Sequence, residues 1–114
     1  MKDFYQFLKE QNEIKLWLDD IRPMPNNFNY HVKTAHEAID ILKTGNVIEI
    51  SLDNDLGPEE AGIGYDVAKY IEEQAFLGNL PKIIWHIHSS NIVGVKNMQM
   101  ALQNADKFWN KNEF

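Results

Sequence analysis

Two pairs of acidic residues have the types and the spacing that divalent metal sites use. Asp19 and Asp20 directly follow one short apolar run, and Asp53 and Asp55 follow another. Single aspartates after strands often only cap turns, but crowded carboxylates repel each other unless a cation is shared. The sequence contains no cysteine, and all-oxygen ligand sets favour Mg²⁺, Mn²⁺ or Ca²⁺ over zinc. We therefore expect these four carboxylates to bind a divalent metal, Mg²⁺ or Mn²⁺.

A histidine and a serine follow a third apolar run. His86 and His88 alternate with an isoleucine, so both point to one side of a strand, and Ser89 comes directly after His88. A histidine at a strand tip can transfer protons near neutral pH. We expect His88, at the end of a strand predicted over residues 82–88, to be the reactive histidine, with Ser89 and Asp53 as further catalytic candidates, whereas His86 either supports the site or belongs to the core. His31 and His36 are expected to be ordinary surface or loop histidines. We also expect Trp17 to lie in the core and Thr34 to be the N-cap of a helix.

Groups that could bind a phosphate lie after this strand and in an earlier loop. Asn91 is a good helix N-cap, and the exposed amides of that helix end, together with Ser90 and a close approach at Gly94, could cradle a phosphate. Arg22 lies in a proline-stiffened loop after the first acidic pair. Its guanidinium could clamp a phosphate, or it could pair with the acidic residues beside it.

Size and composition restrict the protein class. The chain has 114 residues, a hydrophobic share of 44% and a charged share of 25%, which are typical of one soluble domain. No apolar run is long enough to span a membrane and the N-terminus has no signal-peptide pattern, so we expect a cytoplasmic protein of a bacterium or phage-infected cell. A net charge of −6 argues against binding long duplex nucleic acid. It does not exclude a small phosphorylated ligand.

Apolar runs that alternate with amphipathic segments predict an α/β fold with an open parallel sheet. We expect about four strands, with helices on both faces of the sheet. We also expect an N-terminal helix over residues 3–11, within an extension of residues 1–13 that precedes a single domain over residues 14–114. In such sheets ligands bind beyond the carboxyl ends of the strands, where three of the four predicted strands end in polar residues.

Four motifs together resemble the cyclic-phosphate processing receiver domain family. They are LWLDDIRP at residues 16–23, SLDNDLG at 51–57, GYD at 64–66 and HSSNIVG at 88–94. The resemblance covers roughly residues 14–105. It implies a receiver-like, flavodoxin-like fold and action on 2′,3′-cyclic phosphates of nucleotides or RNA ends.

The resemblance also assigns roles by position. It implies that Asp19 and Asp20 match the acidic pair of receiver domains, Asp53 the phosphoacceptor, and Ser89 or Ser90 the hydroxyl residue after the fourth strand. The lysine that balances a phosphoaspartate in receivers has no counterpart, because the chain ends with the helix after the fourth strand. We therefore expect metal binding rather than phosphorelay signalling.

These observations lead to two functional hypotheses. The first is a metal-assisted phosphoesterase, a hydrolase that acts on cyclic or terminal phosphates of nucleotides or RNA ends. The second is a non-catalytic receiver-like module that binds a nucleotide signal or a regulatory protein. For such a protein partner, the N-terminal helix offers the aromatic anchors Phe4, Tyr5 and Phe7.

Overall fold

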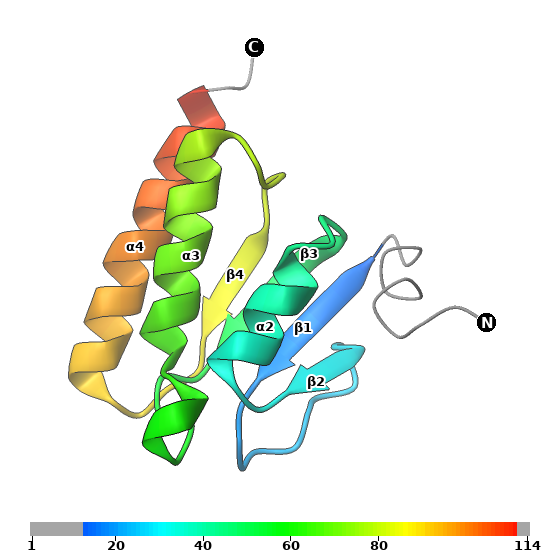
Figure 1. Cartoon of the computed structure of the whole chain (residues 1–114), viewed down its shortest axis with the longest axis vertical. Coiled ribbons are helices and arrows are strands. Elements are labelled where there is room, and N and C mark those ends of the chain that lie inside the picture. Colours follow the sequence, from blue (N-terminus) through cyan, green and yellow to red (C-terminus); the bar gives the residue numbers. More distant parts are fainter. Residues whose placement is uncertain (1–12, 112–114) are drawn as a thin grey trace.

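The computed structural model describes residues 13–111 and shows a four-stranded parallel sheet with three α-helices (Figure 1). The expected N-terminal helix lies outside the described residues. The sheet has the order β2-β1-β3-β4, and all its strand pairs are parallel. Its strands are β1 (Ile14–Leu18), β2 (Tyr30–Val32), β3 (Val47–Leu52) and β4 (Ile84–Ile87). The expected α/β architecture with four parallel strands is therefore confirmed.

The two central strands form because their apolar runs are buried on the helix-covered side of the sheet. Leu16 and Leu18 of β1 lie beside Ile50 and Leu52 of β3, and all four side chains are inaccessible to solvent. Burial of a side chain of this size contributes roughly 1.5–3 kcal/mol. The edge strand β4 is shorter than the predicted run of residues 82–88.

Three α-helices follow the strands. They are α2 (Ala35–Leu42), α3 (Gly64–Leu77) and α4 (Ile92–Lys111), and a short 3₁₀ turn, η1 (Glu59–Ala61), precedes α3. The N-cap predicted for α2 is present, because the amide of Glu37 donates to the Thr34 hydroxyl at 3.1 Å. Gly78 ends α3 in the left-handed conformation, with a φ of 76°, as its place in the sequence predicts.

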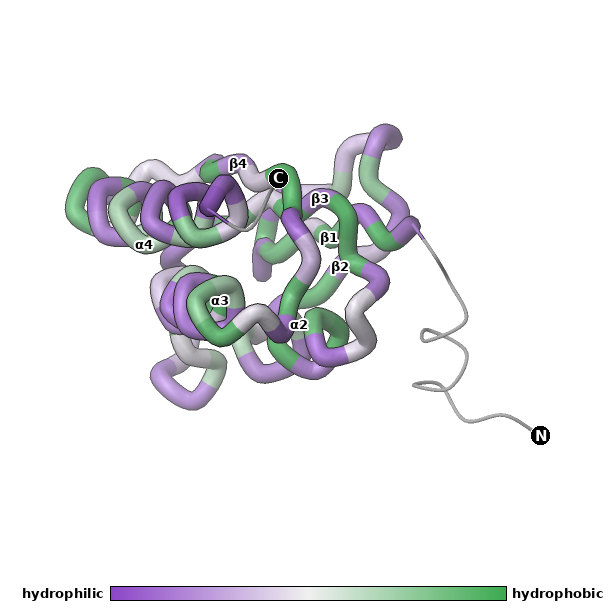
Figure 2. The backbone as a smooth tube through the Cα atoms, turned by 90° about the horizontal axis from the view of Figure 1, so that it is seen from above, coloured by the Kyte–Doolittle hydropathy of each residue, from purple (hydrophilic) through white to green (hydrophobic). Residues whose placement is uncertain are grey.

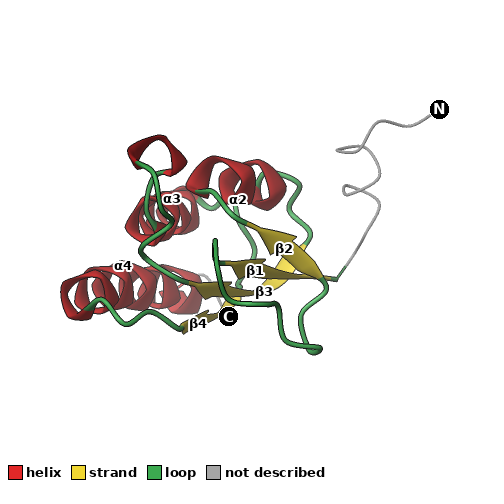
Figure 3. Ribbon diagram, turned by 90° about the horizontal axis from the view of Figure 1, so that it is seen from below, coloured by secondary structure: helices red, strands yellow, loops and turns green. Residues whose placement is uncertain are grey.

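The prediction of helices on both faces is wrong for the described part of the chain. Figures 2 and 3 show α2, α3 and α4 in one layer on the same side of the sheet. From β2 to β3 to β4 the chain advances across the sheet in one direction, so right-handed crossovers place α2 and α3 on one face. The connection from β1 back to β2 runs in the opposite direction and is a loop, and α4, which follows the last strand, packs beside α3.

This loop partly covers the second face of the sheet. Phe28 of the loop is buried against Trp17 of β1, with ring centroids 5.3 Å apart. The expected core position of Trp17 is therefore confirmed, although the tryptophan lies on the face away from the helices. Among residues 13–111 no helix is long and apolar enough to cross a membrane.

Candidate functional site

The carboxyl ends of β1 and β3 bring three aspartates together, as the sequence predicts. Leu18 pairs with Leu52 at the ends of these strands, and the Asp53 amide donates to the Leu18 carbonyl at 3.0 Å. This register places Asp19, Asp20 and Asp53 at one edge of the sheet. Each offers a carboxylate oxygen, and these three atoms lie within 4.8 Å of one another. The group could therefore hold a metal ion.

Asp55 stands apart from this group, contrary to the four-carboxylate prediction. One of its oxygens, Oδ1, accepts from the side-chain amide of Asn91 at 3.1 Å. The residue also forms an isolated antiparallel bridge with Ile63. Asp55 therefore ties the loop after β3 to the start of α4, while it still lines the same cleft.

The three aspartates lie in a cleft of about 700 Å³ beyond the strand ends, a volume in the range of small-molecule sites. Arg22, Leu56 and Ser90 are among the other residues that line it. Its acidic lining residues are Asp19, Asp20, Asp53, Asp55, Glu59 and Asp66. With so many carboxylates and a single guanidinium, the cleft favours cations over anions.

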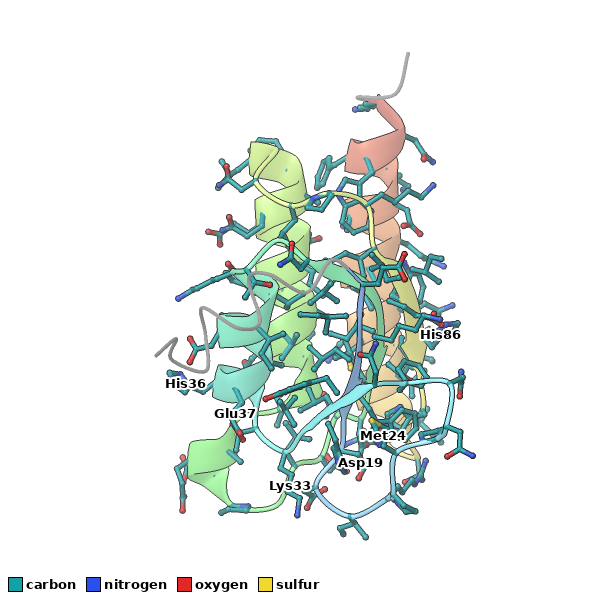
Figure 4. All side chains as sticks on the ribbon, turned by 90° about the vertical axis from the view of Figure 1, so that its right-hand side faces the viewer. Asp19, Met24, Lys33, His36, Glu37 and His86 are labelled. Atoms are coloured by element: carbon teal, nitrogen blue, oxygen red, sulfur yellow. The ribbon has the colours of Figure 1, made fainter. Side chains whose placement is uncertain are left out.

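Asp19 forms the buried floor of the cleft, at the lower end of the sheet in Figure 4. Its Oδ1 accepts hydrogen bonds of 2.8 Å from the amides of Ile21 and Arg22. Burial alone would raise the pKa of Asp19, but these two bonds and a third from His88 hold the pKa below its ordinary value. Asp19 is therefore a carboxylate in a fixed orientation.

The pKa of Asp53 is shifted in the opposite direction, above its ordinary value. Burial and then the negative charge of Asp19 raise the pKa of Asp53. A hydrogen bond with the Ser89 side chain and the positive charge that His88 can carry act in the opposite direction without reversing the shift. Burial is the larger cause of the raised pKa, and repulsion from the carboxylate of Asp19 adds to it.

His88 lies next to the acidic group, as expected, but both its ring nitrogens are occupied. Its Nε2 is 3.0 Å from Oδ2 of Asp19, and its Nδ1 is 2.7 Å from Oγ of Ser51. The ring stacks on Trp17 at a centroid distance of 3.8 Å and does not line the cleft. Burial lowers the pKa of His88 even though Asp19 opposes this shift. This geometry does not favour the proton transfer to substrate that the sequence suggested.

The structure shows what Arg22 contacts. Its guanidinium Nη1 donates to the carbonyl oxygen of His88 at 2.6 Å, and its backbone amide donates to Asp19. The side chain thus joins the loop after β1 to the end of β4. It also lines the cleft, so it can still present positive charge to an anionic ligand.

The three residues directly before α4 have separate roles. Ser89 contacts Asp53, and its hydroxyl also accepts from the amide of Asn91 at 3.1 Å. Ser90 is exposed and lines the cleft. The expected N-cap is present, because Oδ1 of Asn91 accepts from the Gly94 amide at 2.9 Å.

Gly94 does not offer the open phosphate cradle that we expected. Its amide already has Asn91 as a partner, and the residue is buried. A Cβ added at Gly94 would lie 2.6 Å from the side chain of Asn54. The glycine is therefore needed so that α4 can pack closely against Asn54.

Three residues near the site escaped the sequence analysis. His31, expected to be an ordinary surface or loop histidine, bonds through Nε2 to the Asp19 carbonyl at 2.7 Å. Asn54 is buried, and its Oδ1 accepts from the Tyr65 amide at the start of α3. Ser51 supports His88, and a signal for it existed, since it is a polar residue between two apolar residues near the end of β3.

His86 is separate from the acidic group. It bonds to Oε2 of Glu49 at 2.7 Å on the half-exposed second face of the sheet. Figure 4 shows it well above Asp19 and on the side away from α2 and α3. Of the two interpretations that the sequence left open, the core position is wrong, because the His86 side chain is half-exposed and bonds to Glu49.

The geometry agrees with the comparison of the chain with known families. A family model described as "Cyclic-phosphate processing Receiver domain" matches residues 14–104, from β1 into α4. Neither the curated proteins nor the solved structures include a match. The matched region contains the three converging aspartates and the segment from Ser89 to Gly94. The resemblance noted in the sequence is confirmed: the chain belongs to the family of cyclic-phosphate processing receiver domains.

Proposed function

We propose that this protein is a metal-dependent phosphoesterase that acts on a cyclic or terminal phosphate of a nucleotide or RNA end. The observation that carries the proposal is the convergence of Asp19, Asp20 and Asp53 at the floor of a cleft of nucleotide-ligand size. The family to which the chain belongs is named for cyclic-phosphate processing, and this supports the substrate class.

The donor set fits a divalent cation. All three groups are carboxylates, which suit Mg²⁺ and Mn²⁺. Burial and the negative charge of Asp19 both raise the pKa of Asp53, and a bound cation would offset this cost of ionising Asp53. A bound cation would polarise a phosphate and offset its negative charge.

The chain's own residues then bind and orient the substrate. Arg22 places a guanidinium on the wall of the cleft, and Ser90 places a hydroxyl there, where both can bind phosphate oxygens. Proton exchange with a substrate or a water molecule would fall to a carboxyl group on the wall of the cleft. His88 has no such position, because its nitrogens face Asp19 and Ser51.

One observation favours a second candidate function, a non-catalytic module that binds a nucleotide. The His88 ring and the Ser89 hydroxyl, two groups expected to act on a substrate, are both engaged within the protein. A site whose polar groups are already paired can hold a ligand without changing it. The two candidates differ in whether the bound phosphate ester is cleaved.

The test is product analysis after incubation with 2′,3′-cyclic nucleotides and with short RNA that ends in a 2′,3′-cyclic phosphate. Wild type, Asp20→Asn and the control Glu73→Gln are each assayed with Mg²⁺, with Mn²⁺ and with EDTA. Glu73 is exposed on α3 and does not line the cleft. We expect hydrolysis by wild type and by Glu73→Gln only when metal is present, and none by Asp20→Asn.

Two other outcomes would argue against a metal-dependent enzyme. Turnover that persists in EDTA would contradict the metal requirement. Tight binding of an unchanged cyclic nucleotide that depends on Asp20 would support the binding module instead of the enzyme.

A further inference from the structure

Three polar side chains from three separate strand ends form a continuous hydrogen-bonded chain beneath the cleft. Ser51 belongs to β3, His88 follows β4 and Asp19 follows β1. The links are 2.7 Å from Ser51 Oγ to His88 Nδ1 and 3.0 Å from His88 Nε2 to Asp19 Oδ2. Ser51 is 2% exposed and Asp19 is fully buried, so water does not substitute freely for either link.

The chemistry of the groups fixes the direction of both hydrogen bonds. An ionised carboxylate only accepts hydrogen bonds, so His88 must donate its Nε2 proton to Asp19. In a neutral imidazole the other nitrogen then has a lone pair and must accept. The Ser51 hydroxyl is the group within reach of Nδ1, and it can donate. Asp19 therefore selects the tautomer with the proton on Nε2, and the Ser51 hydroxyl stabilises this tautomer by donating to Nδ1.

The imidazole ring of His88 is also restrained by stacking, and the backbone of His88 is held by a hydrogen bond. Trp17 stacks on it with an interplanar angle of 5°. The indole Nε1 of Trp17 donates to the carbonyl of Arg22 at 3.3 Å, and the Arg22 guanidinium donates to the carbonyl of His88. These contacts leave the imidazole little freedom to rotate, so the direction of its Nε2–H bond is set by the fold.

We propose that Ser51 and His88 are positioning residues that orient the Asp19 carboxylate for a divalent cation. This inference rests on the metal site of the proposed function, but it does not depend on whether the site turns over a substrate. Outer partners that orient a metal-binding side chain typically change metal affinity by about 10- to 100-fold when they are removed. Ser51 and His88 act through Asp19 and touch neither metal nor substrate.

The experiment measures Mn²⁺ affinity by calorimetric titration in wild type, His88→Phe and Ser51→Ala. The phenylalanine keeps a ring to stack on Trp17 and removes both hydrogen bonds, and the alanine removes a single hydroxyl. We expect the dissociation constant to rise by about 10- to 100-fold in His88→Phe and by a smaller factor in Ser51→Ala. His86→Phe is the matched control, since His86 bonds to Glu49 on the second face, and its affinity should equal that of wild type.

Two further measurements separate positioning from a loss of structure. His88→Gln retains an amide donor that can reach Asp19, and it should recover part of the affinity that His88→Phe loses. Nitrogen-15 NMR of the His88 ring in the metal-free protein should show the proton on Nε2 in wild type and also in Ser51→Ala, because Asp19 accepts from Nε2 in both. Circular dichroism and urea unfolding establish that each variant is folded.

Several results would overturn the inference. They are wild-type Mn²⁺ affinity in folded His88→Phe and Ser51→Ala, a wild-type ring protonated on Nδ1, or no Mn²⁺ binding by wild type at millimolar concentration. The proposed function fails in a different way, when Mn²⁺ binds with the expected dependence on His88 but no phosphate ester is cleaved.

Discussion

We expect the substitution Asp53→Asn to raise the stability of the metal-free protein. The same substitution should abolish metal binding. The perturbation deletes one of three carboxylates whose oxygens lie within 4.8 Å of one another. Asparagine has nearly the same shape and can still accept the hydrogen bond from Ser89. The main changes are therefore that a charged carboxylate is no longer partly buried at this position and that its repulsion with Asp19 is lost.

The size of the effect follows from Coulomb's law. Two unit charges 4.8 Å apart repel by about 0.9 kcal/mol at the dielectric constant of water and by about 3.5 kcal/mol at an effective constant of about 20. The site is partly buried, so we expect the free energy of unfolding to rise by about 1–3 kcal/mol. For a domain of this size the melting temperature rises by about 4–8 °C per kcal/mol.

The pH dependence provides an independent check. Because the folded-state pKa of Asp53 is raised, its protonated form stabilises the fold. That contribution is complete below the unfolded pKa, about 3.9, and is lost as the pH rises through the folded pKa. The stability difference between Asp53→Asn and wild type should therefore be small in acid and should grow toward neutral pH.

The assay is urea unfolding in EDTA and in excess Mg²⁺. The control is Glu73→Gln, which removes one negative charge, as Asp53→Asn does, but at a position outside the cleft. In EDTA the order of stability should be Asp53→Asn above wild type, with the control within about 0.5 kcal/mol of wild type. In Mg²⁺ at 100 times its dissociation constant, wild type should gain about 2.7 kcal/mol and the variant almost nothing. Equal or lower stability of Asp53→Asn in EDTA at neutral pH would refute the argument that the three carboxylates repel each other.

Two further substitutions test how the site is supported. A Cβ at Gly64 would overlap the backbone carbonyl of Asp53, which cannot move aside, so Gly64→Ala should lower the free energy of unfolding by about 1–3 kcal/mol and weaken Mn²⁺ binding in the same titration. Unchanged stability and affinity would show that α3 is free to shift. Thr34→Ala removes the N-cap of α2 and should cost about 1 kcal/mol in urea unfolding. It should leave Mn²⁺ affinity at the wild-type value, and a loss of affinity would mean that α2 is coupled to the site.

Local sequence patterns were sufficient for most of the elements. The apolar runs of β1 and β3 and the helical spacing of α3 and α4 depend on neighbours in the sequence, and the structure confirms them. The limits of β4 were less accurate, because Ile83 continues the apolar run without joining the ladder that pairs β4 with β3. Helix placement failed for another reason, since the face that a helix covers depends on strand order and crossover direction.

The sequence by itself determined that acidic residues end two strands, and parallel pairing of β1 with β3 was enough to bring three of them together. Only the tertiary structure decided what the remaining polar groups do. His88 is joined to Ser51 and Asp19, which are 37 and 69 positions away along the chain, and Gly94 makes room for Asn54. Hydrogen bonds between residues so far apart depend on how the strand ends pack together. A local pattern of residue types cannot predict that packing.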